Sequence, residues 1–185
     1  MKELLRASVV ILFSIVITTF GFGFQSDNED LGQLREMINF MVGGTWESEN
    51  VNNSDNPEDF KSFYMNFENW HDQNSVRGSI YGIKNNGDTL GLMEVWNFVD
   101  VPNKNIRLLQ RTIWQEHSEG TIFPYEGKHL DIRFKSTMAD GQTYFTKDIH
   151  FKESPDKLRA ETYHRRTEKD DWQKASESLW IRKQD

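Results

Sequence analysis

The sequence predicts an all-β domain, an antiparallel up-and-down β-barrel of about ten strands preceded by one short N-terminal helix. Short runs of alternating apolar and polar residues recur along residues 45–182, as expected for strands with one buried face. Turn-forming residues separate these runs, for example Asn85–Asp88 and Ser154–Asp156. A meander of this many strands avoids exposed edges best by closing on itself, so a barrel is favoured over a sandwich.

Composition limits the classes of function. The chain has 185 residues, enough for one domain with a sizeable core. Its formal net charge is -7 and no basic stripe is present, which argues against nucleic acid as a partner because phosphate binding needs clustered Lys and Arg. There are no cysteines, so disulfides, thiolate metal sites and cysteine nucleophiles are excluded.

Residues 1–24 have the pattern of an export signal. Lys2 and Arg6 precede an uncharged apolar run over residues 7–24. An uncleaved membrane anchor is the alternative, because 18 residues of helix would cover roughly 27 Å, only just short of a hydrocarbon core. In either case the charge distribution predicts a domain that is periplasmic or extracellular, with membrane contact only through such an anchor.

Residues 25–30 form a polar spacer, and the predicted barrel domain covers residues 31–185. Leu31, Leu34, Met37, Ile38 and Met41 recur at helical spacing and predict an amphipathic helix that lies across a mouth or side of the barrel. A membrane-surface helix would need a basic polar face, which this segment lacks.

The strands are expected after this helix. Their predicted ranges are 45–51, 59–70, 75–83, 89–98, 105–115, 120–125, 129–136, 143–151, 157–167 and 172–182.

A short motif links the helix to the first strand. Gly43 and Gly44 supply the backbone freedom for a tight corner, and Trp46 is large enough to plug one end of a small barrel. A helix followed by Gly44-x-Trp46, about ten strands, and Arg182 in the last strand resemble the calycin superfamily: lipocalins, fatty-acid-binding proteins and bacterial lipocalin-like domains, including the DUF1579 type. The resemblance implies that Trp46 closes the barrel floor and that Arg182 packs over it. It does not imply a particular ligand.

Two strands in the middle of the chain supply candidate cavity residues. If the more apolar faces point inward, residues 89–98 contribute Glu94 and Trp96, and residues 105–115 contribute Gln110 and Trp114. A carboxyl group facing an apolar cavity would have a raised pKa and could donate a proton or bind an amine. The alternatives for Glu94 are a position in solvent or an ion pair with an arginine such as Arg107 or Arg111.

The eighth and ninth predicted strands supply two further candidates, Thr162 and His164, on one face with Leu158 and Ala160. Phe145, Lys147, Ile149 and Phe151 are expected to face the same interior, and Tyr144, Asp148 and His150 the exterior. His164 could serve as a haem ligand or a general base, or it could lie in solvent beside Arg165 and Arg166.

Two hypotheses for function follow. The preferred one is an exported protein that binds a small hydrophobic or amphipathic molecule in the barrel cavity through Glu94, Trp96, Gln110, Trp114, Thr162 and His164. The alternative is an enzyme on the same barrel, an isomerase, cyclase or dehydratase with Glu94 as general acid or base. No metal site and no cofactor are predicted, because the histidines lack ligand spacing, and the oligomeric state is left open.

Overall fold

The computed structural model describes residues 31–50, 54–125 and 129–183. The predicted export signal at residues 1–24 and the spacer at 25–30 lie outside these residues. The chain divides into two compact units, Met1–Gln33 and Leu34–Asp185. The second unit contains ten strands, whose bounds are β1 (Thr45–Glu49), β2 (Phe60–Asn69), β3 (Ser75–Lys84), β4 (Thr89–Asp100), β5 (Asn105–Thr112), β6 (His117–Tyr125), β7 (His129–Thr137), β8 (Thr143–Ser154), β9 (Lys157–Arg165) and β10 (Gln173–Lys183).

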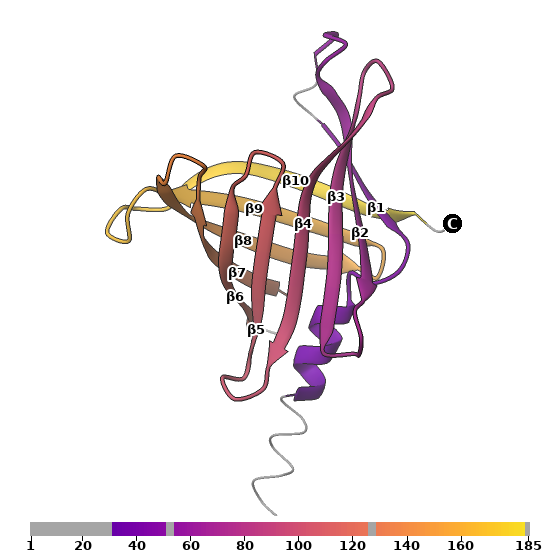
Figure 1. Ribbon diagram of the computed structural model, residues 1–185. Coiled ribbons are helices and arrows are strands. Elements are labelled where there is room, and N and C mark those ends of the chain that lie inside the picture. The colour runs from indigo at the N-terminus through magenta and orange to yellow at the C-terminus, as the bar shows by residue number, and fades with distance from the viewer. Residues whose placement is uncertain (1–30, 51–53, 126–128, 184–185) are drawn as a thin grey trace, which may run out of the picture. The chain divides into compact units, whose positions relative to one another are not determined.

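The ten strands form one closed antiparallel barrel (Figure 1). Each strand pairs with the next in the chain, and β1 pairs with β10 to close the ring. Closure satisfies the backbone groups that an open sheet would leave unpaired at its edges. The predicted fold class, a ten-stranded up-and-down barrel with a short N-terminal helix, is confirmed.

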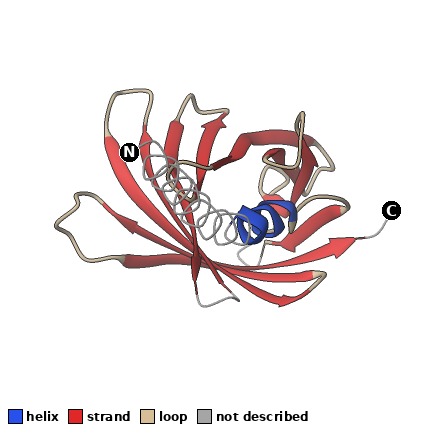
Figure 2. Ribbon diagram, turned by 90° about the horizontal axis from the view of Figure 1, so that it is seen from below, coloured by secondary structure: helices blue, strands red, loops and turns tan. Residues whose placement is uncertain are grey.

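Within the second unit, residues 34–39 of the helix at residues 31–39 supply the cover for one end of the barrel. Within the second unit, Leu34 and Ile38 are buried, one helical turn apart on the same face. Figure 2 shows this segment in blue across the barrel end. The helix that the structure describes is too short and too polar to cross a membrane.

The corner between helix and β1 depends on glycine. Gly43 and Gly44 have φ angles of 80° and 69°, a region that side chains rarely adopt. A Cβ atom at Gly44 would also lie 2.8 Å from the backbone oxygen of Lys183. Glycine at this position therefore lets the chain turn tightly against β10.

Trp46 and Arg182 lie together at the floor of the barrel. Trp46 is fully buried, and its indole nitrogen donates a hydrogen bond to the Met41 carbonyl at 3.1 Å. The guanidinium of Arg182 lies 4.5 Å from the centroid of the indole ring. It also donates hydrogen bonds to the carbonyls of Phe40 and Val42, so it ties the end of the helix to β10. Trp46 and Arg182 therefore hold the end of the helix, β1 and β10 together at this end of the barrel.

Candidate ligand-binding cavity

A cavity of about 220 Å³ lies inside the barrel, and Met37, Ile38 and Met41 line it from the helix end. Its wall is mainly apolar and comes from the helix end and from nine of the ten strands. The apolar lining residues are Met37, Ile38, Met41, Met65, Phe67, Ile80, Met93, Val95, Ile106, Leu108, Ile122, Leu130, Ile132, Phe134, Ala160 and Trp180. Six polar side chains interrupt this wall, those of Asn97, Gln110, Asp148, His150, Thr162 and Ser178.

The opposite end of the barrel is polar. Ser118 and Ser136 are buried, and their hydroxyl oxygens lie 2.8 Å apart. Tyr144 donates a hydrogen bond of 2.6 Å to Glu116 from the neighbouring turn. Burial and this bond raise the pKa of the Tyr144 hydroxyl to about 12, so it remains a donor at neutral pH. The cavity therefore lies between an apolar floor and a hydrogen-bonded polar end.

Asp148 is the acidic group of the cavity wall. It lies on β8, opposite Ile132 of β7 and Thr162 of β9. Burial raises the pKa of its carboxyl group to about 6, although a hydrogen bond from the Thr162 hydroxyl acts in the opposite direction. Its Oδ1 atom is buried without a hydrogen-bond partner among the described residues. A buried acceptor of this kind is costly unless a donor reaches it.

His150 lies two residues further along the same face of β8, opposite Leu130 and Ala160. Burial lowers the pKa of its imidazole to about 4, because the surrounding atoms disfavour the charged form. His150 is therefore neutral at physiological pH. Asp148 and His150 keep some accessible surface because that surface faces the cavity.

The predicted inward face of the fourth strand is wrong from Met93 onward, because a β-bulge precedes that residue. Tyr81 pairs with Gly91, but the next pair joins Ile80 to Met93, so Leu92 is an extra residue. An extra residue moves every later side chain to the opposite face. Met93, Val95 and Asn97 line the cavity instead, while Glu94 and Trp96 lie on the outer face.

Glu94 consequently has a different role from the one expected. Its side chain is 51% exposed and lies 3.4 Å from Arg77 of the adjacent strand β3. The alternative of an ion pair in solvent describes it correctly, although the partner is neither Arg107 nor Arg111. The enzyme hypothesis assigned acid or base catalysis to Glu94, and a carboxylate on the outer face has no access to the cavity.

The predicted faces of the eighth strand are also reversed. Ser154 pairs with Lys157, and a regular hairpin would continue by placing Phe151 opposite Ala160. A bulge at Glu153 instead pairs Lys152 with Leu158, which brings His150 opposite Ala160. Asp148 and His150 therefore line the cavity, and the prediction that they face the exterior is wrong.

Cations cover the aromatic residues that this bulge turns outward. The Arg159 guanidinium lies 3.8 Å from the ring centroid of Phe151, and that of Arg165 lies 5.4 Å from the centroid of Phe145. The aliphatic stems and guanidinium groups of these arginines shield the rings from solvent.

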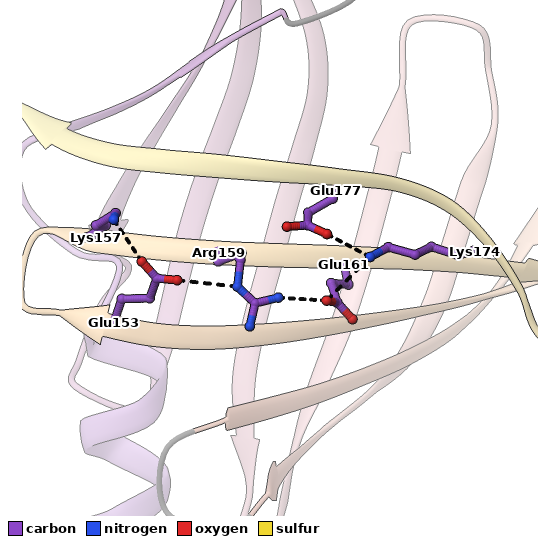
Figure 3. Close-up of polar contacts among 6 residues, drawn as sticks. All are labelled: Glu153, Lys157, Arg159, Glu161, Lys174 and Glu177. Carbon is purple, nitrogen blue, oxygen red and sulfur yellow. Dashed lines mark hydrogen bonds and ion pairs between the residues drawn. The ribbon is translucent and has the colours of Figure 1, made fainter.

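The same outer face carries a chain of ion pairs across β8, β9 and β10 (Figure 3). The distances between paired atoms range from 2.7 Å, between Arg159 and Glu161, to 3.4 Å, between Lys174 and Glu161. The chain consists of Lys157, Glu153, Arg159, Glu161, Lys174 and Glu177. Side chains alternate between the two faces of a strand, so the charged residues of β9 and β10 lie on the outer face, while Ala160, Thr162 and Ser178 of the same strands line the cavity.

The remaining candidate residues divide between the cavity and the surface. Gln110 and Thr162 line the cavity, as expected. Trp114 is 62% exposed, because β5 ends at Thr112 and the tryptophan falls in the following turn. His164 has the inward phase of β9 but lies beyond the cavity, exposed at the polar end, with its ring 5.5 Å from that of Tyr144. Neither Trp114 nor His164 reaches the cavity.

The alternating pattern of the eighth strand does not identify the two titratable residues of the cavity, Asp148 and His150. Their strand reads Phe145-Thr146-Lys147-Asp148-Ile149-His150-Phe151, in which both faces combine polar and apolar residues. Lys147 could have indicated which face is exposed. It shares a face with Phe145, Ile149 and Phe151, and lysine is among the residues least often fully buried, which favours this face as the outer one.

In the parts of the chain that the structure describes, no group of three or more His, Asp or Glu side chains is arranged to hold a metal ion. A scan against protein-family models finds no matching family. A search of curated proteins finds no significantly similar sequence. The cavity is therefore the feature of this protein from which a function can be inferred.

Proposed function

We propose that this protein is an exported binding protein that holds a small, predominantly apolar molecule in the barrel cavity. The observation that supports it is the cavity of about 220 Å³, in which an apolar wall carries a few polar groups. This combination is typical of small-molecule sites, where the apolar wall supplies affinity and the polar groups orient the ligand. The proposed export depends on Lys2 and Arg6 ahead of the apolar run at residues 7–24.

The volume limits the size of the ligand. Drug-sized ligands occupy pockets of at least about 300 Å³, so they exceed this cavity. An apolar cavity of about 150 Å³ binds benzene, so a cavity of 220 Å³ would accommodate roughly ten non-hydrogen atoms. Long-chain fatty acids and tetrapyrroles are therefore too large for the cavity in this conformation.

Native mass spectrometry of the chain purified from its own exported fraction tests the proposal. A bound molecule of roughly ten non-hydrogen atoms should be released when the same sample is denatured in organic solvent. An apo sample should instead be stabilised against heat by toluene. If neither a released molecule nor stabilisation by toluene is observed, the binding proposal is wrong.

A pair of variants separates cavity binding from surface binding. Ala160 lines the cavity, whereas Ala175 is exposed on β10. Ala160→Leu adds three carbon atoms to the cavity wall and should abolish ligand retention, provided that it folds. Ala175→Leu adds the same atoms outside the cavity and should retain the ligand. Equal retention by the two variants would place the ligand on the surface.

A further inference from the structure

The charges of the cavity restrict which small molecule can bind. Asp148 and His150 are the two titratable residues among the side chains that line it. His150 is neutral at physiological pH, because burial lowers the pKa of its imidazole to about 4. The described lining residues include no Lys or Arg. When Asp148 is ionised, the described side chains that line the cavity therefore carry one negative charge and no positive charge.

Two buried acceptors in this cavity lack donors. Asp148 Oδ1 on β8 and Asn97 Oδ1 on β4 are both buried without hydrogen-bond partners among the described residues. Buried polar atoms in proteins are nearly always hydrogen-bonded, so each unsatisfied one calls for an explanation, such as a bound water or ion. The wall therefore lacks hydrogen-bond donors, rather than acceptors, at these two positions.

We propose that the ligand is a small ammonium compound, whose apolar skeleton lies against the methionine, isoleucine and leucine side chains and whose positive charge pairs with the Asp148 carboxylate. This inference depends on the proposed binding function and defines its ligand class. A protonated amine supplies both the missing donors and the missing positive charge. The neutral His150 can lie next to it without electrostatic repulsion.

The same reasoning disfavours a carboxylate ligand. A carboxylate would bring a second negative charge into a cavity that holds Asp148 and no cation among its described lining residues. It would also leave both unpartnered acceptors without donors. A neutral alcohol could supply one donor but no charge, so it should bind between the amine and the carboxylate in affinity.

Isothermal titration with four probes tests this order of affinities. Toluene, benzyl alcohol, benzylamine and benzoate share one aromatic ring with one carbon substituent, and they differ in charge and hydrogen-bonding capacity. At about pH 7.5, where the Asp148 carboxyl is mainly ionised, benzylamine should bind roughly 10- to 100-fold more tightly than toluene or benzyl alcohol. Benzoate should bind most weakly.

Two variants and a pH series assign the effect to Asp148. Asp148→Asn should remove the preference for benzylamine, whereas Glu94→Gln, which removes an exposed carboxylate, should preserve it. Below about pH 6 benzylamine must displace a proton from Asp148, so its affinity should fall about tenfold for each pH unit, while toluene binding stays constant. The pH series uses the unmodified chain, so it decides the question even if Asp148→Asn fails to fold.

The possible outcomes distinguish this inference from the proposed function. If toluene binds in the cavity but benzylamine binds no more tightly than benzyl alcohol, the ammonium inference is wrong and the binding function stands. Tightest binding of benzoate would also overturn it. If none of the four probes binds, the proposed function itself fails.

Discussion

Replacing Asp148 with Asn should stabilise this protein at neutral pH, although Asp148 is central to the proposed site. The Asp148 carboxylate is buried in an apolar wall, with one oxygen lacking a hydrogen-bond partner among the described residues. Ionising it in the folded state is therefore less favourable than in water, where the unfolded chain ionises it freely. Asparagine has nearly the same shape and carries no charge.

The expected magnitude follows from the pKa. Burial raises the pKa of Asp148 from its ordinary value of 3.8 to about 6, which corresponds to roughly 3 kcal/mol at about 1.4 kcal/mol per pKa unit. A folded pKa above the unfolded one means that this loss of stability is fully present above pH 6 and disappears as the pH falls to 3.8. Burying the asparagine amide offsets part of the gain, so the net stabilisation above pH 6 should be about 1–2 kcal/mol.

Urea unfolding of the two proteins at about pH 7.5 and at about pH 4 provides the assay. The free energy of unfolding of Asp148→Asn should exceed that of the parent chain at the higher pH, and this advantage should decline by about 2.4 kcal/mol at the lower pH. Glu94→Gln should change stability by less than about 0.5 kcal/mol at either pH, because Glu94 is half-exposed. A stability difference that is the same at both pH values would refute the account of a buried, ionised Asp148.

Three further predictions concern other parts of the barrel. The free energy of unfolding of His150→Gln should rise by roughly 3 kcal/mol relative to that of the parent chain as the pH falls from about 7.5 to 4. The reason is that the pKa of His150 is lowered from 6.5 to about 4, so that mainly the unfolded histidine is protonated in that interval. Urea unfolding at both pH values measures this change, and a difference that is the same at both would contradict it. Arg182→Met should lower the free energy of unfolding by about 2–4 kcal/mol, since it removes the cation–π contact with Trp46 and two hydrogen bonds. A loss below about 0.5 kcal/mol in urea unfolding would show that the guanidinium of Arg182 does not stabilise the barrel floor. Gly120→Ala should lower the free energy of unfolding by about 1–3 kcal/mol and the thermal midpoint by several degrees, because the added Cβ atom would lie 2.1 Å from the Arg133 carbonyl oxygen. An unchanged midpoint in calorimetry would mean that β6 and β7 can move apart without loss of stability.

The opposing titrations of Asp148 and His150 have a consequence for the whole protein. As the pH falls from about 6.5 to 4, the raised pKa of Asp148 increases stability while the lowered pKa of His150 decreases it by a similar amount. The two effects largely cancel in the unmodified chain. Single variants are therefore needed to detect either residue, and the stability of the parent chain over this interval reports on neither.

Local properties of the chain were sufficient to predict the architecture. Alternation of apolar and polar residues identifies a strand wherever one face is buried, and residues such as those of Asn85–Asp88 mark the turns between strands. Gly44 and Trp46 are recognisable for a similar reason, because the backbone conformation of the corner and the volume of the indole ring each restrict the choice of residue.

The faces of individual strands could be predicted only where pairing is regular. On β5, which shows no register shift with either neighbour, Ile106, Leu108 and Gln110 point inward as expected. On β4 and β8 a single extra residue in the ladder reverses the faces, and this reversal replaces Glu94 with Asp148 as the acidic group nearest the cavity. Nothing in the order of residues along one strand records the position of a bulge, because a bulge is a property of two paired strands.

The sequence by itself therefore determined the fold class, the strand and turn order, and the Gly44–Trp46 corner, all of which depend on residues close together in the chain. Only the tertiary structure decided which side chains share the cavity. Asp148, Asn97 and Gln110 come from strands that are far apart in sequence, and their common orientation depends on two bulges and on closure of the barrel. The physical reason is that side-chain direction in a sheet alternates with every residue, so one inserted residue exchanges inside for outside while leaving the local pattern unchanged.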